Sequence, residues 1–157
     1  MLAQQFVETG KSATQYRVST LYGEALYCQR QHLVEPMPEL ASITEEFFSS
    51  TIATNVADVS RKVITLENEP DVVELARKCH RCFPWVPLKG IDILRETSTG
   101  NLFVLELNCA GNTWHISSDF ARKQRTDNFT KEKIVAQFGA WDVATKVSIK
   151  NTRLLAK

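Results

Sequence analysis

This 157-residue sequence lacks the features that indicate a membrane protein, a secreted protein or a nucleic-acid-binding protein. No apolar run approaches the ~18–20 residues that a helix needs to cross a bilayer. The N-terminus has no basic segment followed by an apolar one, so there is no sign of a secretory signal. Nineteen basic and eighteen acidic residues leave a net charge of +1, which gives no broad basic field. We therefore expect a cytoplasmic globular protein whose partners include neither nucleic acid nor membrane.

Cysteine is present, but without the further ligands that a zinc site needs. Cys79 and Cys82 form a CxxC, and the sequence has no second CxxC and no HxxxH. A redox CxxC usually opens a helix, whereas this pair falls late in an expected helix, on its apolar stripe. We interpret both thiols as buried core residues, with a redox or zinc role as the alternative.

The periodicity of the chain predicts an α+β fold, an antiparallel sheet built from hairpins with flanking helices. Segments with alternating or β-favourable residues predict strands at 2–7, 15–21, 25–31, 59–66, 88–95 and 102–108.

Two helices complete the expected fold. One begins near Pro70, which suits a first turn, and stops before Pro84. The other begins at Thr130 and carries a continuous apolar face to Val147. We expect a single domain over residues 1–157, which consists of a core at 2–115 and a C-terminal helical region at 116–157.

The last predicted hairpin brings polar side chains together. Opposed residues of an antiparallel hairpin have a constant index sum, so a turn centred on Thr99 places Asp92 opposite Glu106. Asn108 lies two residues beyond Glu106 and therefore points the same way. A register shift of one residue would separate these side chains.

Two opposed carboxylates repel each other, and a cation would offset that repulsion. Ligands that are all oxygens suit magnesium, which keeps waters and borrows phosphate oxygens. The alternative is a solvated strand face at the edge of the sheet. Leu102 and Val104 are expected on the same face as Glu106, which argues against full exposure.

The segment GIDILRETSTGNLFVLELNCAGNTW, residues 90–114, resembles the metal-binding strand pair of the ATP-grasp superfamily, which includes glutathione synthetase and D-alanine–D-alanine ligase. The family pattern is a Gly-hydrophobic-Asp strand, a turn, and a strand ending Glu-hydrophobic-Asn before a glycine-containing loop. Three upstream segments are similar to other parts of the family's domain: LAQQFVETG (2–10), QYRVSTLYGEALYCQRQ (15–31) and ATNVADVSRKVITL (53–66). The resemblance implies the C-terminal subdomain of an ATP-grasp domain.

The resemblance also implies roles for individual residues. The implied ligands of Mg2+ (or Mn2+), which would bridge the phosphates of ATP, are Asp92, Glu106 and Asn108. The implied catalytic arginines, which contact phosphates or an acyl-phosphate, are Arg17 and Arg30. The implied nucleotide-binding residues are Gln4, Gln5, Phe6, Val7 and Asn55. The implied acceptor-substrate residues are Asn112, Thr113 and His115. For Arg17 the alternative is a cross-strand ion pair, and for His115 it is ordinary packing of its loop.

The activity implied by the resemblance is an ATP-dependent carboxylate–amine (or thiol) ligase that acts through an acyl-phosphate. Its partners would be ATP and small-molecule or peptide carboxylate and amine substrates. The preceding half of the family's domain is not among these residues, so we expect this chain to need that half or to self-associate through an exposed apolar surface. The alternative is a non-catalytic remnant or interaction module, and Ala57 and Asp58 favour it because they replace glycines of the family.

Overall fold

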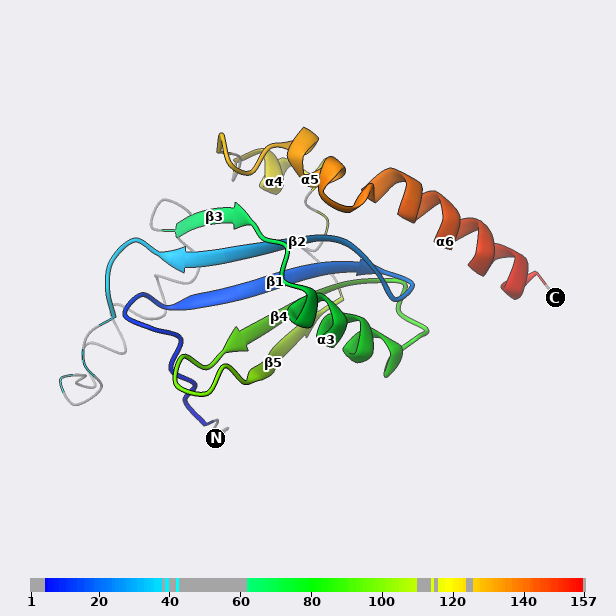
Figure 1. The fold of residues 1–157 in the computed structure, drawn as a ribbon. Coiled ribbons are helices and arrows are strands. Elements are labelled where there is room, and N and C mark those ends of the chain that lie inside the picture. Colours follow the sequence, from blue (N-terminus) through cyan, green and yellow to red (C-terminus); the bar gives the residue numbers. More distant parts are fainter. Residues whose placement is uncertain are drawn as a thin grey trace.

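The computed structural model describes residues 5–37, 39, 42, 62–109, 114, 116–123 and 126–156. Within these residues, five strands form one sheet in the order β3-β2-β1-β4-β5, and each neighbouring pair is antiparallel. The strands are β1 Thr14–Leu21, β2 Glu24–Leu33, β3 Lys62–Leu66, β4 Leu88–Arg95 and β5 Leu102–Asn108. The helices are α3 Pro70–Arg81, α4 Asp119–Lys123, α5 Lys131–Phe138 and α6 Ala140–Leu155. The predicted α+β fold is confirmed (Figure 1).

The hairpin of β1 and β2 closes through Tyr22 and Gly23. Both residues have positive φ, 49° and 91°, which is the backbone of the two-residue turns that match the twist of a hairpin. A register shift lies between Ser19 and Thr20, where Leu26 is an extra residue on β2. Because one inserted residue reverses the alternation, the side chains of β2 beyond Leu26 point to the opposite face from the one that the turn alone predicts.

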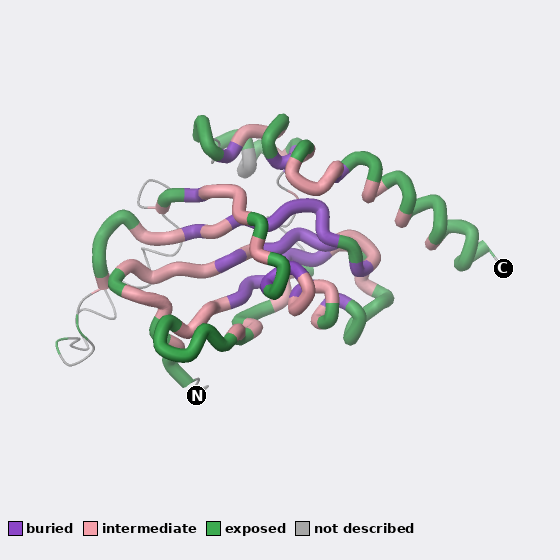
Figure 2. The backbone as a smooth tube through the Cα atoms, in the orientation of Figure 1, coloured by how far each residue is buried: buried purple, intermediate pink, exposed green. Residues whose placement is uncertain are grey.

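Helix α3 covers one face of the sheet (Figure 1), and the purple segments of Figure 2 mark the buried layer beneath it. Pro70 occupies the first turn, where its missing N–H costs no hydrogen bond. The core on this face consists of Val72, Val73 and Ala76 from α3 and Tyr16, Val18, Ala25, Cys28, Ile91 and Ile93 from the strands. Burying each large aliphatic side chain stabilises the fold by roughly 1.5–3 kcal/mol. This apolar face leaves the other face of β1 and β4 for polar side chains.

A second core joins the C-terminal helices to β2 and β3. Its buried members are Leu26, Tyr27, Ile64, Ile116, Phe129, Ile134 and Ala140. Gln137 of α5 continues the sheet's hydrogen bonding beyond the end of β3. Its Nε2 donates to the carbonyls of Cys28 (3.0 Å) and Glu67 (2.8 Å), and its Oε1 accepts from the Cys28 N–H at 2.9 Å. One side chain therefore satisfies three backbone groups at this edge.

The single C-terminal helix predicted from Thr130 is wrong in one respect. Thr130 does cap α5, because its side chain accepts a hydrogen bond from the Lys133 N–H at 3.2 Å. The helix then ends at Gly139, whose φ of 66° is left-handed, and α6 starts from there. Glycine adopts that conformation without strain, so it terminates one helix and redirects the chain.

The predicted strand at residues 2–7 is also wrong for its described part, since residues 5–7 belong to no strand. This segment leads instead to the β4–β5 turn, where the Thr97 N–H donates to the Glu8 carbonyl at 2.9 Å. Among the described residues, no helix is long and apolar enough to cross a membrane.

Candidate functional site

A row of polar side chains crosses the sheet on the face opposite α3. In register, Gln29 of β2 opposes Arg17 of β1, Arg17 opposes Asp92 of β4, and Asp92 opposes Glu106 of β5. Directly opposed residues project from the same face with their Cβ atoms ~5 Å apart. The neighbouring position along β1, Val18, belongs instead to the core beneath α3. Four adjacent strands therefore direct one polar residue each to a common line.

Arg17 and Asp92 form the centre of this row. The Arg17 Nε donates to Asp92 Oδ1 at 2.6 Å, and Nη2 donates to Oδ2 at 2.5 Å. The side chains are 17% and 2% exposed, so the pair is shielded from water. The same Nη2 lies 3.9 Å from Glu106 Oε1, whose side chain is 55% exposed. The alternative for Arg17, a cross-strand ion pair, is therefore observed.

Asn108 joins the two carboxylates. Its Nδ2 donates to Asp92 Oδ2 at 3.1 Å and to Glu106 Oε1 at 2.9 Å. The opposition of Asp92 and Glu106, and the convergence of Asn108 upon them, follow the sequence-based register. The metal-binding role of these three residues stays a prediction.

The face expected for Leu102 and Val104 is wrong. The register of β4 and β5 shifts between Asp92 and Ile93, so Val104 opposes Ile93 and packs with Leu102 on the core beneath α3. Leu105 is the extra residue of this bulge and is partly exposed. The register next to the turn would continue to Asp92 opposite Leu105, and the extra residue is what brings Glu106 opposite Asp92.

Ionisation at the site follows from burial and from these contacts. Burial raises the pKa of Asp92, while the hydrogen bonds and charge of Arg17 oppose that shift. The hydrogen bond from Asn108 lowers the pKa of Glu106. Burial alone would lower the pKa of Arg17, but the hydrogen bonds and charge of Asp92, together with the charges of Tyr27 and Glu106, raise it. Two carboxyl groups whose pKa values move apart suit a site that handles cations or protons.

The donor set fits magnesium chemically. It offers carboxylate oxygens from Asp92 and Glu106 and an amide oxygen from Asn108, and hard oxygen ligands suit magnesium. Nδ2 of Asn108 faces the carboxylates, so binding requires the amide to rotate and present Oδ1. Within the described residues, no three or more His, Cys, Asp or Glu side chains lie together in a way that could hold a metal ion. The proposed ligand set contains only two such side chains, Asp92 and Glu106, and its third ligand is the amide of Asn108.

Arg30 does not join this site. Its register partner is Tyr16, a member of the core beneath α3, so Arg30 projects from the face opposite Arg17. The reason is the extra residue Leu26, which reverses the alternation that would otherwise place Arg30 across from Gln15.

Gln29 takes the place on the site face that the sequence reading gave to Arg30. It is fully buried, and neither its Nε2 nor its Oε1 has a hydrogen-bond partner in the described structure. Sequence reasoning missed Gln29 because only the bulge reveals its orientation.

Lys62 was also missed. It lies two residues before Ile64 on β3, and Ile64 opposes Gln31, which shares its face with Gln29. The pKa of Lys62 is lowered by burial and then by the nearby charge of Arg17, while Asp92 opposes the shift. A second cation therefore lies within electrostatic reach of Arg17 and Asp92.

Several predicted residues lie elsewhere. Gln5, Phe6 and Val7 precede the first strand, and Gln5 and Phe6 are exposed. The predicted residues that lie outside the described part of the chain are Gln4, Asn55, Asn112, Thr113 and His115.

The thiol prediction needs a correction. Cys79 is half-buried against the core beneath α3, but Cys82 is exposed as the C-cap residue of that helix. Burial raises the pKa of Cys79. The two thiols are therefore not a buried pair.

The chain was compared with known protein families, curated proteins and solved structures, and only the solved structures gave matches. No protein-family model matches the chain, and no curated protein matches it either. A Chryseobacterium gregarium RiPP-associated ATP-grasp ligase in complex with ADP and a leader and core peptide matches at 15% identity and a TM-score of 0.44, over 83% of this chain and 34% of that one. The ATP-grasp ligase PsnB, complexed with a minimal precursor, matches at 17% identity and a TM-score of 0.40, over 69% and 28%.

The macrocyclase MdnC from Microcystis aeruginosa MRC, bound to the precursor peptide MdnA, matches at 11% identity and a TM-score of 0.39, over 64% of this chain and 26% of that one. This chain thus spans between about a quarter and a third of these neighbours. ATP-grasp ligases, the family that the sequence resembles, are among the structures that the chain is similar to.

Proposed function

We propose that this chain is the magnesium- and phosphate-binding part of an ATP-dependent carboxylate–amine (or thiol) ligase that acts through an acyl-phosphate. The observation that carries the proposal is the convergence of Asp92, Glu106 and Asn108 beside Arg17. Its substrates would be a small-molecule or peptide carboxylate and an amine, with ATP as the source of the phosphoryl group.

Each residue of the site has a task in such a reaction. Asp92, Glu106 and Asn108 would hold the magnesium ion, which when bound neutralises phosphate charge during transfer. Arg17 carries a planar guanidinium that can bind phosphate oxygens in a bidentate manner. Lys62 adds a second positive charge on the same face. The exposed carboxylate of Glu106 faces solvent and is open to an incoming ion.

A second candidate is a non-catalytic interaction module that keeps the fold. One observation favours it: Asp92 already accepts hydrogen bonds from Arg17 and Asn108, so the cluster is satisfied without any ligand. In that case the row is a structural ion pair that holds β1 to β4. The two candidates differ in whether nucleotide binding depends on Glu106.

Calorimetric titration with a non-hydrolysable ATP analogue separates them. We expect nucleotide binding that requires Mg2+ and is at least about tenfold weaker in Glu106→Gln. Loss of a residue that only supports a metal ligand typically weakens metal binding about 10–100-fold, and Glu106 would itself be a ligand. Glu74→Gln is the matched control, because Glu74 lies on α3, away from this face, and pairs with Arg81. Equal, magnesium-independent binding by both variants would leave the interaction module as the better account.

A further inference from the structure

Both oxygens of the Asp92 carboxylate are engaged by donors of this chain. Arg17 bonds Oδ1 at 2.6 Å and Oδ2 at 2.5 Å, and Asn108 also donates to Oδ2. The guanidinium lies close to Glu106 as well, at 3.9 Å. A divalent ion held by these carboxylates must therefore sit within a few ångströms of a fixed positive charge.

We propose that Arg17 is an internal counter-cation that competes with the metal for Asp92 and releases the carboxylate when a nucleotide phosphate can take its place. This inference rests on the proposed function of the site. Asp92, Glu106 and Arg17 together have a net charge of −1, from two carboxylates and one guanidinium. A metal ion that binds without a nucleotide therefore meets only half the negative charge that the two carboxylates would offer without Arg17.

A nucleotide changes the balance. Its phosphates offer Arg17 a bidentate acceptor that is as suitable as a carboxylate. Once Arg17 bonds a phosphate, its charge no longer opposes the metal, and Asp92 regains free lone pairs. Metal and nucleotide then raise each other's affinity, and the coupling is reciprocal by thermodynamic necessity.

The rotation of Asn108 is linked to the same step. Arg17 Nη2 and Asn108 Nδ2 both donate to Asp92 Oδ2, and Nδ2 also donates to Glu106. A metal requires the amide oxygen where the amide nitrogen now lies. When Arg17 leaves and Asn108 rotates, Asp92 Oδ2 loses both of its hydrogen-bond donors. The site therefore has two arrangements, one in which Arg17 bonds Asp92 and one in which the metal does.

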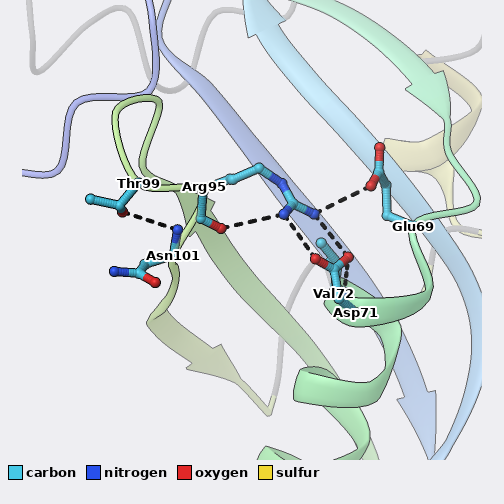
Figure 3. Close-up of polar contacts among 7 residues, drawn as sticks. Glu69, Asp71, Val72, Arg95, Thr99 and Asn101 are labelled. Atoms are coloured by element: carbon cyan, nitrogen blue, oxygen red, sulfur yellow. Dashed lines mark hydrogen bonds and ion pairs between the residues drawn. The ribbon is translucent and has the colours of Figure 1, made fainter.

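The test uses Mn2+ alone, with free ion counted by electron paramagnetic resonance. We expect Arg17→Gln to bind Mn2+ at least about tenfold more tightly than wild type, because a unit charge a few ångströms from a divalent ion has an effect of that size even in a water-like dielectric. Arg17→Lys, which keeps the charge, should remain closer to wild type. Arg95→Gln is the matched control and should not change the affinity, since Arg95 pairs with Asp71 and Glu69 on the α3 side (Figure 3).

A measurement on the wild-type chain covers the case in which Arg17→Gln does not fold. The Nε–H signal of Arg17 in a 15N NMR spectrum should move when Mg2+ and ADP are added together and stay nearly unchanged with Mg2+ alone, while the Arg95 signal stays constant. An Arg17 signal that stays fixed at saturation with both would overturn the proposal.

The two claims fail differently. Glu106-dependent Mn2+ binding of equal affinity in wild type and Arg17→Gln would overturn the role of Arg17 and leave the proposed function in place. No Glu106-dependent Mn2+ binding in any variant, with or without ADP, would overturn the proposed function itself.

Discussion

Breaking the Arg17–Asp92 pair should destabilise the fold far more than breaking a similar pair at the surface. Arg17→Met leaves the carboxylate of Asp92, whose side chain is 2% exposed, without its charged partner. Removing one partner of a buried pair costs about 3–5 kcal/mol. Because Arg17 itself keeps some exposure and Asn108 still donates to Asp92, we expect about 3 kcal/mol.

The matched control is the pair of Arg95 and Asp71 (Figure 3). It is also bidentate, through Nη1 and Nη2 of Arg95 with both contacts at 2.8 Å, but the Asp71 side chain is 54% exposed. Water screens such a pair, so Arg95→Met should cost less than about 1 kcal/mol.

The assay is urea unfolding followed by circular dichroism, with thermal unfolding as a check. A loss of 3 kcal/mol corresponds to a fall of roughly 6–12 °C in Tm for a chain of this size. In the double variant Arg17→Met, Asp92→Leu, an apolar pair replaces both charges and most of the loss should be recovered. Equal losses for Arg17→Met and Arg95→Met would refute the view that burial makes the first pair special.

Three further predictions follow from other parts of the fold. Gln137→Leu should cost about 2–4 kcal/mol in urea unfolding, because the Cys28 N–H and the Glu67 carbonyl lose the bond to this side chain and the Cys28 carbonyl keeps only the bond from the Glu67 N–H. Burial, and then the charge of Lys89, lower the pKa of His80 to about 4. Between about pH 6.5 and pH 4 only the unfolded chain gains this proton, so the stability of the fold should fall as the pH drops through that range. His80→Asn should flatten this pH dependence of stability, and an unchanged slope would contradict the prediction. Gly139→Ala should cost about 1–2 kcal/mol, since alanine is strained at a φ of 66°, and a neutral result would mean that the break between α5 and α6 does not need that conformation.

Much of the sheet could be predicted from alternation alone. The strands at 88–95 and 102–108 were placed at their observed bounds, because regular patterns of apolar residues end at turn residues on either side. The opposition of Asp92 and Glu106 agrees with counting across a turn centred on Thr99, but the observed turn pairs Arg95 with Leu102, and the extra residue Leu105 is what brings Glu106 opposite Asp92. Local pattern was sufficient for the strand bounds, whereas the opposition also depended on the bulge.

The errors come from inserted residues that have no sequence signal. Leu26 and Leu105 each add one residue to a strand, and each reverses which side chains share a face. This reversal moved Arg30 away from the site, brought Gln29 to it, and placed Val104 on the apolar face. By contrast, Gly139 does carry a signal, because a glycine within a helical pattern is typical of a helix end.

The ionic arrangement was only partly accessible. The sequence could show that Arg17 and Asp92 lie on predicted strands, but the pairing of β1 with β4 joins segments 75 residues apart. No local pattern specifies which strands become neighbours. The bidentate contact, and with it the competition between Arg17 and a metal, therefore emerges only from the assembled sheet.

The most direct test of the central claim is Mn2+-induced broadening of backbone amide NMR signals in the presence of an ATP analogue, on wild type and Glu106→Gln. We expect broadening centred on Asp92, Glu106 and Asn108 in the wild type and its loss in the variant. Broadening centred elsewhere, or equal broadening in both proteins, would contradict the assignment of these residues as a metal site.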